Sequence, residues 1–106
     1  MMLYPSLRWV VGRLRNNVIY RVRYKVLDGY VVGSEAKGTA RPDSDLDIAV
    51  IITPVRGRSA LQISERYHAQ FADDQWKPHW NGRVVDIQFF YPDDPELAGY
   101  SRIKLQ

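Results

Sequence analysis

Residues 33–52 read GSEAKGTARPDSDLDIAVII, a Gly-Ser turn followed by two aspartates one residue apart and then an apolar run. The run is rich in β-branched residues and is followed by Pro54, which predicts a strand over residues 46–52. Side chains two apart in a strand point to the same face. We therefore expect Asp45 and Asp47 to project together, while the alternate residues from Leu46 onward face the core.

The chemistry of this unit suits a phosphate and a metal ion. A glycine-containing turn can offer backbone N–H groups to phosphate oxygens, and carboxylates are the hard oxygen ligands that Mg²⁺ prefers. Two carboxylates on one face repel each other and raise each other's pKa, and a bound divalent cation removes that penalty. A nucleotide with its metal ion is the expected ligand.

A third carboxylate lies further along the chain. Residues 83–91 are rich in β-branched and aromatic residues and predict another strand, within which Asp86 is the acidic residue. A charge in a segment suited to burial needs a partner. If this strand neighbours residues 46–52, Asp86 can complete a three-carboxylate cluster with Asp45 and Asp47, able to hold two Mg²⁺ ions roughly 3.5–4 Å apart. The alternative interpretation is that residues 43–47 are only a polar turn leading into the strand, and that the glycines before them serve backbone geometry only.

The remaining elements follow from periodicity. Apolar residues from Leu7 onward recur at helical spacing, which predicts a helix that ends near residue 20 and a strand that runs to residue 32. Residues 59–71 predict a second helix with Ser59 as its N-cap. Residues 73–82 are expected to form a turn and residues 92–95 a loop. Residues 96–106 are too few to assign, and fraying is expected there.

Length and composition indicate a globular protein. With 106 residues, 45% of them hydrophobic and 25% charged, the chain fits a single domain over residues 1–106. No apolar run approaches the roughly 18–20 residues of a membrane span, and the start lacks a signal-peptide pattern, so we expect a cytoplasmic protein without a membrane role. The absence of cysteine excludes disulfides, thiolate zinc sites and a cysteine nucleophile.

The net charge of +3 comes largely from residues 1–25, which contain six basic and no acidic residues. A basic arm can bind phosphate backbones or an acidic protein. The solvated side of an amphipathic element is the favoured interpretation. We therefore do not expect nucleic acid to be the partner.

The motif residues resemble the DNA polymerase beta-like nucleotidyltransferase superfamily, in particular its minimal members. The signature of that superfamily is a strand, Gly-Ser, a short Ala/Arg/Gly-containing turn, Ser-Asp-x-Asp opening the next strand, and a third Asp on a later strand. The matching region covers roughly residues 30–90. The residues that match in order are Gly33, Ser34, Ala36, Lys37, Gly38, Ser44, Asp45, Leu46, Asp47 and Asp86.

This resemblance implies an α/β (α+β) fold with a short mixed sheet, the acidic cluster on one face and helices packed on the other. It implies a Mg²⁺-dependent enzyme that moves a nucleoside monophosphate from a nucleoside triphosphate, with ATP the favoured donor, to an acceptor hydroxyl. The catalytic and metal-binding residues would be Asp45, Asp47 and Asp86, with two Mg²⁺ ions. The nucleotide-binding residues would be Gly33, Ser34, Lys37 and Ser44.

Two departures from the family pattern bear on binding. Lys37 stands where many relatives carry arginine, so it would meet phosphate as a point charge. Glu35 adds negative charge beside the phosphate turn and would weaken triphosphate binding.

The resemblance also implies a partner, because minimal members are often paired with a helical HEPN-type toxin that they modify or mask as antitoxins. Trp76, Trp80 and the basic N-terminal segment are candidates for that contact, and a homo-oligomer is equally consistent. A non-catalytic antitoxin or regulatory binding module on the same scaffold is the alternative function. Transfer to a small molecule such as an aminoglycoside is a third possibility, for which the sequence reveals no acceptor pocket.

Overall fold

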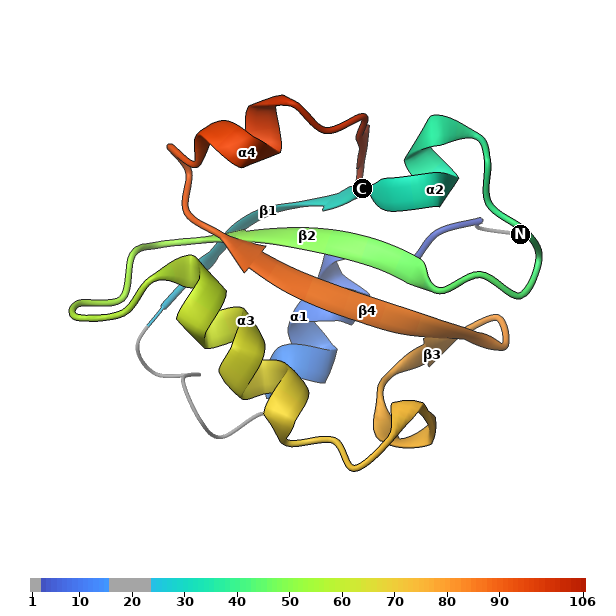
Figure 1. Cartoon of the computed structure of the whole chain (residues 1–106), viewed down its shortest axis with the longest axis horizontal. Helices are drawn as coiled ribbons and strands as arrows, with labels where there is room; N and C mark the ends of the chain where they lie inside the picture. The colour runs from blue at the N-terminus through green and yellow to red at the C-terminus, as the bar shows by residue number, and fades with distance from the viewer. Residues whose placement is uncertain (1–2, 16–23) are drawn as a thin grey trace.

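The structure, a computed structural model, describes residues 3–15 and 24–106. Helices are interspersed with strands along the chain, and the longer strands form the centre of the molecule (Figure 1). The elements are α1 (Leu7–Arg15), β1 (Val26–Val31), α2 (Gly33–Lys37), β2 (Leu46–Ile52), α3 (Ala60–Ala69), the 3₁₀ turn η1 (Asp74–Trp76), β3 (His79–Trp80), β4 (Arg83–Phe90), α4 (Pro95–Ala98) and β5 (Ile103–Lys104).

One mixed sheet contains all these strands, in the order β3-β4-β2-β1-β5. Strands β2 and β4 pair in parallel, and the other neighbours pair antiparallel. Figure 1 shows β2 and β4 side by side across the middle of the molecule. The predicted α+β class with a mixed sheet is confirmed, and the two strands that carry Asp47 and Asp86 are neighbours. The assignment of residues 1–106 to a single domain stays a prediction.

The main core lies on one face of the sheet, between the strands and the two longer helices. Alternate residues of β2 and β4 point to this face, where α1 contributes Val10 and Leu14 and α3 contributes Ile63 and Tyr67. Burying these side chains stabilises the strands and fixes their register, because a slip of one residue would bring the opposite face inward. The strand residues in this core are Val31, Leu46, Ile48, Val50, Ile52, Val85, Ile87 and Phe89.

The opposite face of the sheet is divided into an apolar and a polar part. At one end Leu97 of α4 packs on Ala49, Ile51 and Phe90. At the other end the same face carries Asp47 and Asp86, beside which α2 begins at Gly33. The short helix α4 therefore adds a small second cluster next to the acidic residues.

Helix α3 is built as the sequence predicts. The Ser59 hydroxyl accepts a hydrogen bond from the Gln62 N–H, and the Gln62 side chain accepts one from the Ser59 N–H, which forms a capping box. α3 also covers the part of the outer edge of β4 that does not pair with β3. The Phe89 N–H donates to the Ser64 hydroxyl at 2.8 Å, and His68 Nε2 lies 2.9 Å from the Ile87 carbonyl oxygen. These contacts satisfy a strand edge that would otherwise be open.

Three expectations about short segments were wrong. Residues 96–106, which have no assigned structure in the prediction, contain most of α4 and all of β5, and the buried Leu105 donates its N–H to the Gly29 carbonyl at 2.9 Å. Residues 73–82 contain η1 and β3 as well as turns. The turn after β1 is one short helix, α2. β3 and β5 gain their hydrogen bonds from neighbouring strands, which local sequence patterns do not reveal. α2, η1 and α4 are short turns closed by local hydrogen bonds.

The predicted end of the first helix near residue 20 and the start of the following strand lie outside the described residues. None of the helices in residues 3–15 and 24–106 has the length and apolar character needed to cross a bilayer.

Candidate active site

Asp47 and Asp86 lie opposite each other on neighbouring strands. In the parallel pairing of β2 with β4, Asp47 is the register partner of Asp86. Their chain neighbours Leu46, Ile48, Val85 and Ile87 are buried in the main core, so the alternation of the strand sends both carboxylates to the other face. The core thereby fixes the backbone under both acids.

A cavity of about 330 Å³ lies over this acidic pair. Gly33 and Lys37 of α2 line it together with Asp47 and Asp86, so it gathers four of the seven predicted site residues. Asp45, Ser34 and Ser44 do not line it. The other lining residues are Val32, Ile48, Gln88, Gly99, Tyr100 and Ser101.

The backbone of Gly33 lies close to the Asp47 side chain. It has a φ of 67°, in the left-handed region, and a Cβ atom built there would overlap the carboxylate of Asp47. The preceding residue is also fixed, because the Val32 N–H donates to the Asp47 carbonyl at 2.9 Å. Only glycine allows the turn to come this close to the strand.

The residues before β2 hold the loop in shape. Asp45 is exposed and directly precedes the strand. The Ser44 hydroxyl accepts a hydrogen bond from the Arg41 N–H at 2.9 Å, and the Ser34 carbonyl accepts one from the Thr39 N–H at 2.9 Å. In this arrangement Ser44 and Ser34 close turns, and their contacts with a nucleotide stay a prediction.

Arg83, at the start of β4, ties this loop to α2. Its Nε donates to the Ser44 carbonyl at 2.9 Å, and its guanidinium lies 3.3 Å from the Glu35 carboxylate. Both side chains of the ion pair are largely buried, with exposed fractions of 16% and 21%. Glu35 was expected to weaken triphosphate binding by its charge, but Arg83 offsets that charge. Sequence reasoning did not assign Arg83 a role.

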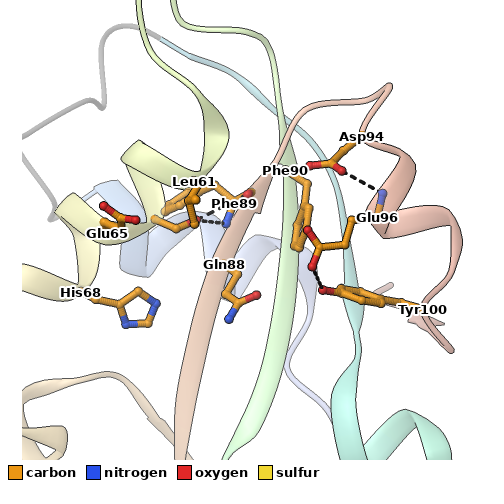
Figure 2. A pocket seen from close by; sticks show the side chains of 10 residues that line it. Leu61, Glu65, His68, Gln88, Phe89, Phe90, Asp94, Glu96 and Tyr100 are labelled. Atoms are coloured by element: carbon orange, nitrogen blue, oxygen red, sulfur yellow. Dashed lines mark hydrogen bonds between the residues drawn. The ribbon is translucent and has the colours of Figure 1, made fainter.

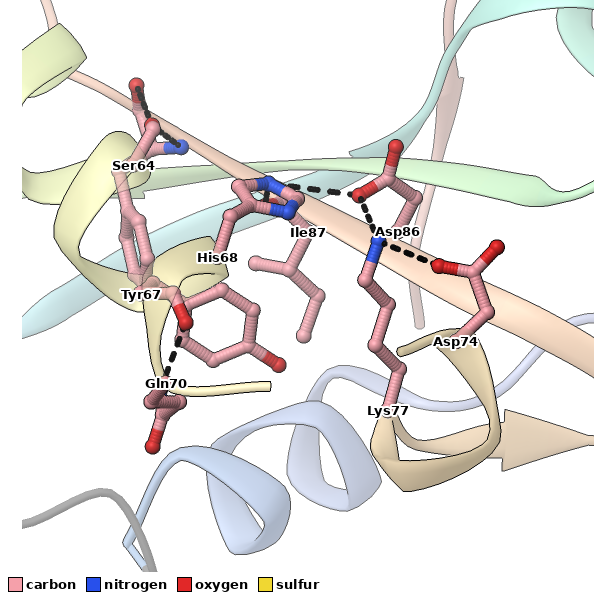
Figure 3. A network of polar contacts seen from close by, with 9 residues as sticks. Ser64, Tyr67, His68, Gln70, Asp74, Lys77, Asp86 and Ile87 are labelled. Atoms are coloured by element: carbon pink, nitrogen blue, oxygen red, sulfur yellow. Dashed lines mark hydrogen bonds and ion pairs between the residues drawn. The ribbon is translucent and has the colours of Figure 1, made fainter. Parts of the chain in front are cut away.

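Asp86 is in contact with two cationic or polar side chains (Figure 3). His68 Nε2 lies 3.3 Å and Lys77 Nζ 3.8 Å from its Oδ1, and Lys77 also pairs with Asp74 at 3.1 Å. Burial lowers the pKa of the Lys77 ammonium, but the hydrogen bond to Asp74 and the negative charge of Asp86 outweigh this and raise the pKa. Lys77 is therefore charged at neutral pH.

Sequence reasoning missed both contacts of Asp86. His68 follows Ser64 by four residues, and this spacing places both on one helix face, which could have suggested a shared strand edge. No sequence signal points to Lys77, because its position depends on how η1 packs beside β4.

The acidic pair carries an electrostatic penalty. Burial raises the pKa of the Asp47 carboxyl, the charges of Asp86 and Asp45 raise it further, and the charge of Arg83 acts in the opposite direction. A divalent cation bound here would remove this penalty, and carboxylate oxygens are suitable donors for Mg²⁺. The donor set of Asp47 and Asp86 therefore fits the ion.

A complete metal centre is nevertheless not formed in this arrangement. Within residues 3–15 and 24–106, no group of three or more His, Cys, Asp or Glu side chains is placed to hold a metal ion. The reason lies in the contacts above, since Asp45 is exposed ahead of β2 and Asp86 pairs with His68 and Lys77.

The family model of the nucleotidyltransferase domain matches residues 14–103. The chain belongs to this family. The match runs from the end of α1 to β5 and includes Gly33, Asp47 and Asp86. Searches of curated proteins and of solved structures gave no significant match. Membership indicates nucleotidyl transfer as the general activity and is consistent with the mixed sheet described above.

Proposed function

We propose that this protein is a Mg²⁺-dependent nucleotidyltransferase of the cytoplasm, which moves a nucleoside monophosphate from ATP to a hydroxyl of a partner protein such as a HEPN-type toxin. One observation carries the proposal. Asp47 and Asp86 face each other on adjacent parallel strands under a cavity that Gly33 and Lys37 also line, inside the region that matches the family.

The reaction assigns a task to each residue. The acceptor oxygen forms a bond to the α-phosphorus, the bond from that phosphorus to the bridging oxygen breaks, and pyrophosphate leaves with the bonding electrons. Asp86 accepts the hydroxyl proton. Asp45, Asp47 and Asp86 would hold two Mg²⁺ ions, whose charge would stabilise the transferring phosphate and the leaving group.

The turn before β2 would bind the rest of the triphosphate. Gly33 and Ser34 would present backbone N–H groups to the β- and γ-phosphates, and Lys37 would add a positive charge. Ser44 would contribute its hydroxyl from the loop. Lys37 is exposed at the cavity and pairs with no other residue in the described part of the chain, so it can reach an anion there.

The test is transfer of label from ATP. The protein is incubated with labelled ATP, Mg²⁺ and the protein encoded by the neighbouring gene, and labelling of that protein is measured. We expect labelling by the wild type and none by Asp45→Asn or Asp47→Asn. Asp43→Asn, which removes an exposed carboxylate outside the cavity, is the matched control and should retain activity. Absence of labelling with all four nucleoside triphosphates would contradict the proposal.

A second candidate function is a non-catalytic antitoxin or regulatory binding module. The observation that favours it is the pairing of Asp86 with His68 and Lys77, together with the lack of a three-ligand group among the described residues. On this hypothesis, Asp86→Asn leaves neutralisation of the partner intact. Trp76→Ala, at a side chain that is 65% exposed, weakens it. Loss of neutralisation in Asp86→Asn together with loss of labelling would favour the enzyme.

The two tryptophans differ as contact candidates. Trp80 packs edge-to-face on Trp9, with ring centroids 5.2 Å apart, so it belongs partly to the core. Trp76 is the better candidate for an interface, either with another protein or with a second copy of the chain. Light scattering of the wild type and of Trp76→Ala distinguishes these two partners.

A further inference from the structure

A second and larger cavity adjoins the cavity over the acidic pair. It has a volume of about 530 Å³ and lies between α3, the end of β4 and the segment that contains α4 (Figure 2). Gln88 and Tyr100 line both cavities, and His68, which contacts Asp86, lines the larger one. Gln88 follows Asp86 by two residues on the same strand face, so the wall that the two cavities share lies next to Asp86 along β4.

The charge of the larger cavity is opposite to that of the whole protein. Three carboxylates, those of Glu65, Asp94 and Glu96, line it, and among the described residues no Lys or Arg does. The protein as a whole carries a net charge of +3. A positively charged ligand would therefore be attracted to this cavity in particular rather than to the surface in general.

Two of these acids also shape the wall of the cavity. Asp94 caps α4 by accepting from the Glu96 N–H at 2.9 Å, and the Tyr100 hydroxyl donates to the Glu96 carboxylate at 2.7 Å (Figure 2). Glu65 has no hydrogen bond or ion pair with another described residue, and neither does the side-chain amide of Gln88. These two groups are available to a ligand.

The remaining walls are apolar and aromatic. Leu61 of α3 is 67% exposed, and the rings of Phe90 and Tyr100 meet edge-to-face at 5.8 Å. Apolar walls with carboxylates at the rim suit arginine or lysine side chains, which have an apolar stem and a charged end. A volume of this size is also ordinary for a specific binding pocket.

We propose, on the basis of the proposed nucleotidyl transfer, that this cavity binds the acceptor and that the acceptor is a polypeptide segment with basic residues beside the reacting hydroxyl. The hydroxyl lies toward Asp86, Gln88 hydrogen-bonds the segment at the junction of the two cavities, and Glu65 pairs with a basic side chain. Sequence reasoning found no acceptor pocket within the chain. The structure supplies one next to the residue that would accept the proton.

The test is binding of fluorescent pentapeptides to the full chain, measured by anisotropy. Each peptide has a central serine or tyrosine flanked on both sides by two arginines, two glutamates or two alanines. We expect the arginine-flanked peptides to bind and added salt to weaken their binding, because exposed charge pairs are screened. Equal binding of the three classes, or none by the arginine-flanked peptides, would overturn the proposal.

Substitutions locate the binding. Glu65→Gln and Gln88→Ala should each raise the Kd of the arginine-flanked peptides about threefold to tenfold, the range for one charge pair or hydrogen bond. Asp93→Asn is the matched control, because it removes an exposed carboxylate that does not line the cavity. An equal effect of Glu65→Gln and Asp93→Asn would contradict the location.

A parallel measurement separates this inference from the proposed function. The melting temperature is recorded with Mg²⁺ and ATP, and transfer of label from ATP to the same peptides is followed. Stabilisation and labelling without preference for arginine-flanked peptides would overturn the acceptor assignment alone. No stabilisation and no labelling with any triphosphate would overturn the proposed function and the acceptor role with it.

Discussion

At the scale of single residues, the backbone of Gly33 lies against the Asp47 carboxylate of the candidate active site. An alanine there must adopt a positive φ and also displace the Asp47 carboxylate. We expect Gly33→Ala to destabilise the protein by about 1–3 kcal/mol and to abolish the stabilisation by Mg²⁺ and ATP. Denaturant unfolding with and without the ligand measures both effects.

Gly57→Ala is the control for Gly33→Ala. Gly57 has a similar φ of 78°, but a Cβ atom added there would have no other atom within 4 Å, so its substitution introduces strain without a clash. We expect it to retain ligand binding. If both alanine variants lost the same stability and both still bound nucleotide, the close approach of Gly33 to Asp47 would not matter.

Asp47 predicts a dependence of stability on pH. Its folded-state pKa is raised above the ordinary value of 3.8, first by burial and then by Asp86 and Asp45. The folded state therefore binds the carboxyl proton of Asp47 more tightly than the unfolded state does. The stability that this protonation contributes is full below the ordinary pKa and is lost as the pH rises through the folded pKa. At neutral pH and without metal, the ionised Asp47 is destabilising.

Asp47→Asn should consequently melt at a higher temperature than the wild type at neutral pH without metal. The difference should shrink as the pH falls toward the ordinary aspartate pKa, and the variant should gain nothing from Mg²⁺ and ATP. A pH series of melting curves checks this, with Asp43→Asn as the exposed control. A difference that is constant over the series would show that the Asp47 charge is not its cause.

At the scale of elements, the contact between α3 and the edge of β4 is important because it holds the strand that carries Asp86. The Ser64 hydroxyl is the buried partner of the Phe89 N–H. Ser64→Ala leaves that N–H unsatisfied, and we expect a loss of about 1–3 kcal/mol in unfolding free energy. Ser101→Ala, at an exposed serine, should change it by less than about 0.5 kcal/mol. Equal losses would contradict the role of this edge contact.

The elements also show what sequence alone could predict. β2 has the predicted bounds, β4 differs from its prediction by one residue, and α3 begins at the predicted cap, because each has a strong local pattern. β3 and β5 are two residues long and depend on neighbouring strands for hydrogen bonds, so no local pattern indicates them. α4 is only four residues long, and its start signals, the Asp94 cap and Pro95, fall in the segment predicted to be a loop. The same limit applies at the candidate site. The motif indicated Gly33, Lys37, Asp47 and Asp86, whereas His68 and Lys77 reach Asp86 only through tertiary packing.

At the scale of the whole molecule, the segment after α4 completes the sheet. β5 pairs with β1, and Leu105 is only 4% exposed and packs in the main core. We expect Leu105→Ala to cost about 2–5 kcal/mol, whereas Leu27→Ala, at a residue that is 51% exposed, costs much less. Denaturant unfolding measures both, and similar costs would contradict a structural role for the segment.

The parallel pairing of β2 with β4 has a consequence for folding kinetics. Two antiparallel strands can be joined by a hairpin, but two parallel strands need a longer crossover connection. The connection between β2 and β4 contains α3, η1 and β3, and the two strands pair only once it has formed. Asp47 and Asp86 are therefore brought together by non-local contacts that form slowly. A ligand that needs both carboxylates recognises the completed sheet, so Mg²⁺ with ATP should slow unfolding and leave the refolding rate unchanged.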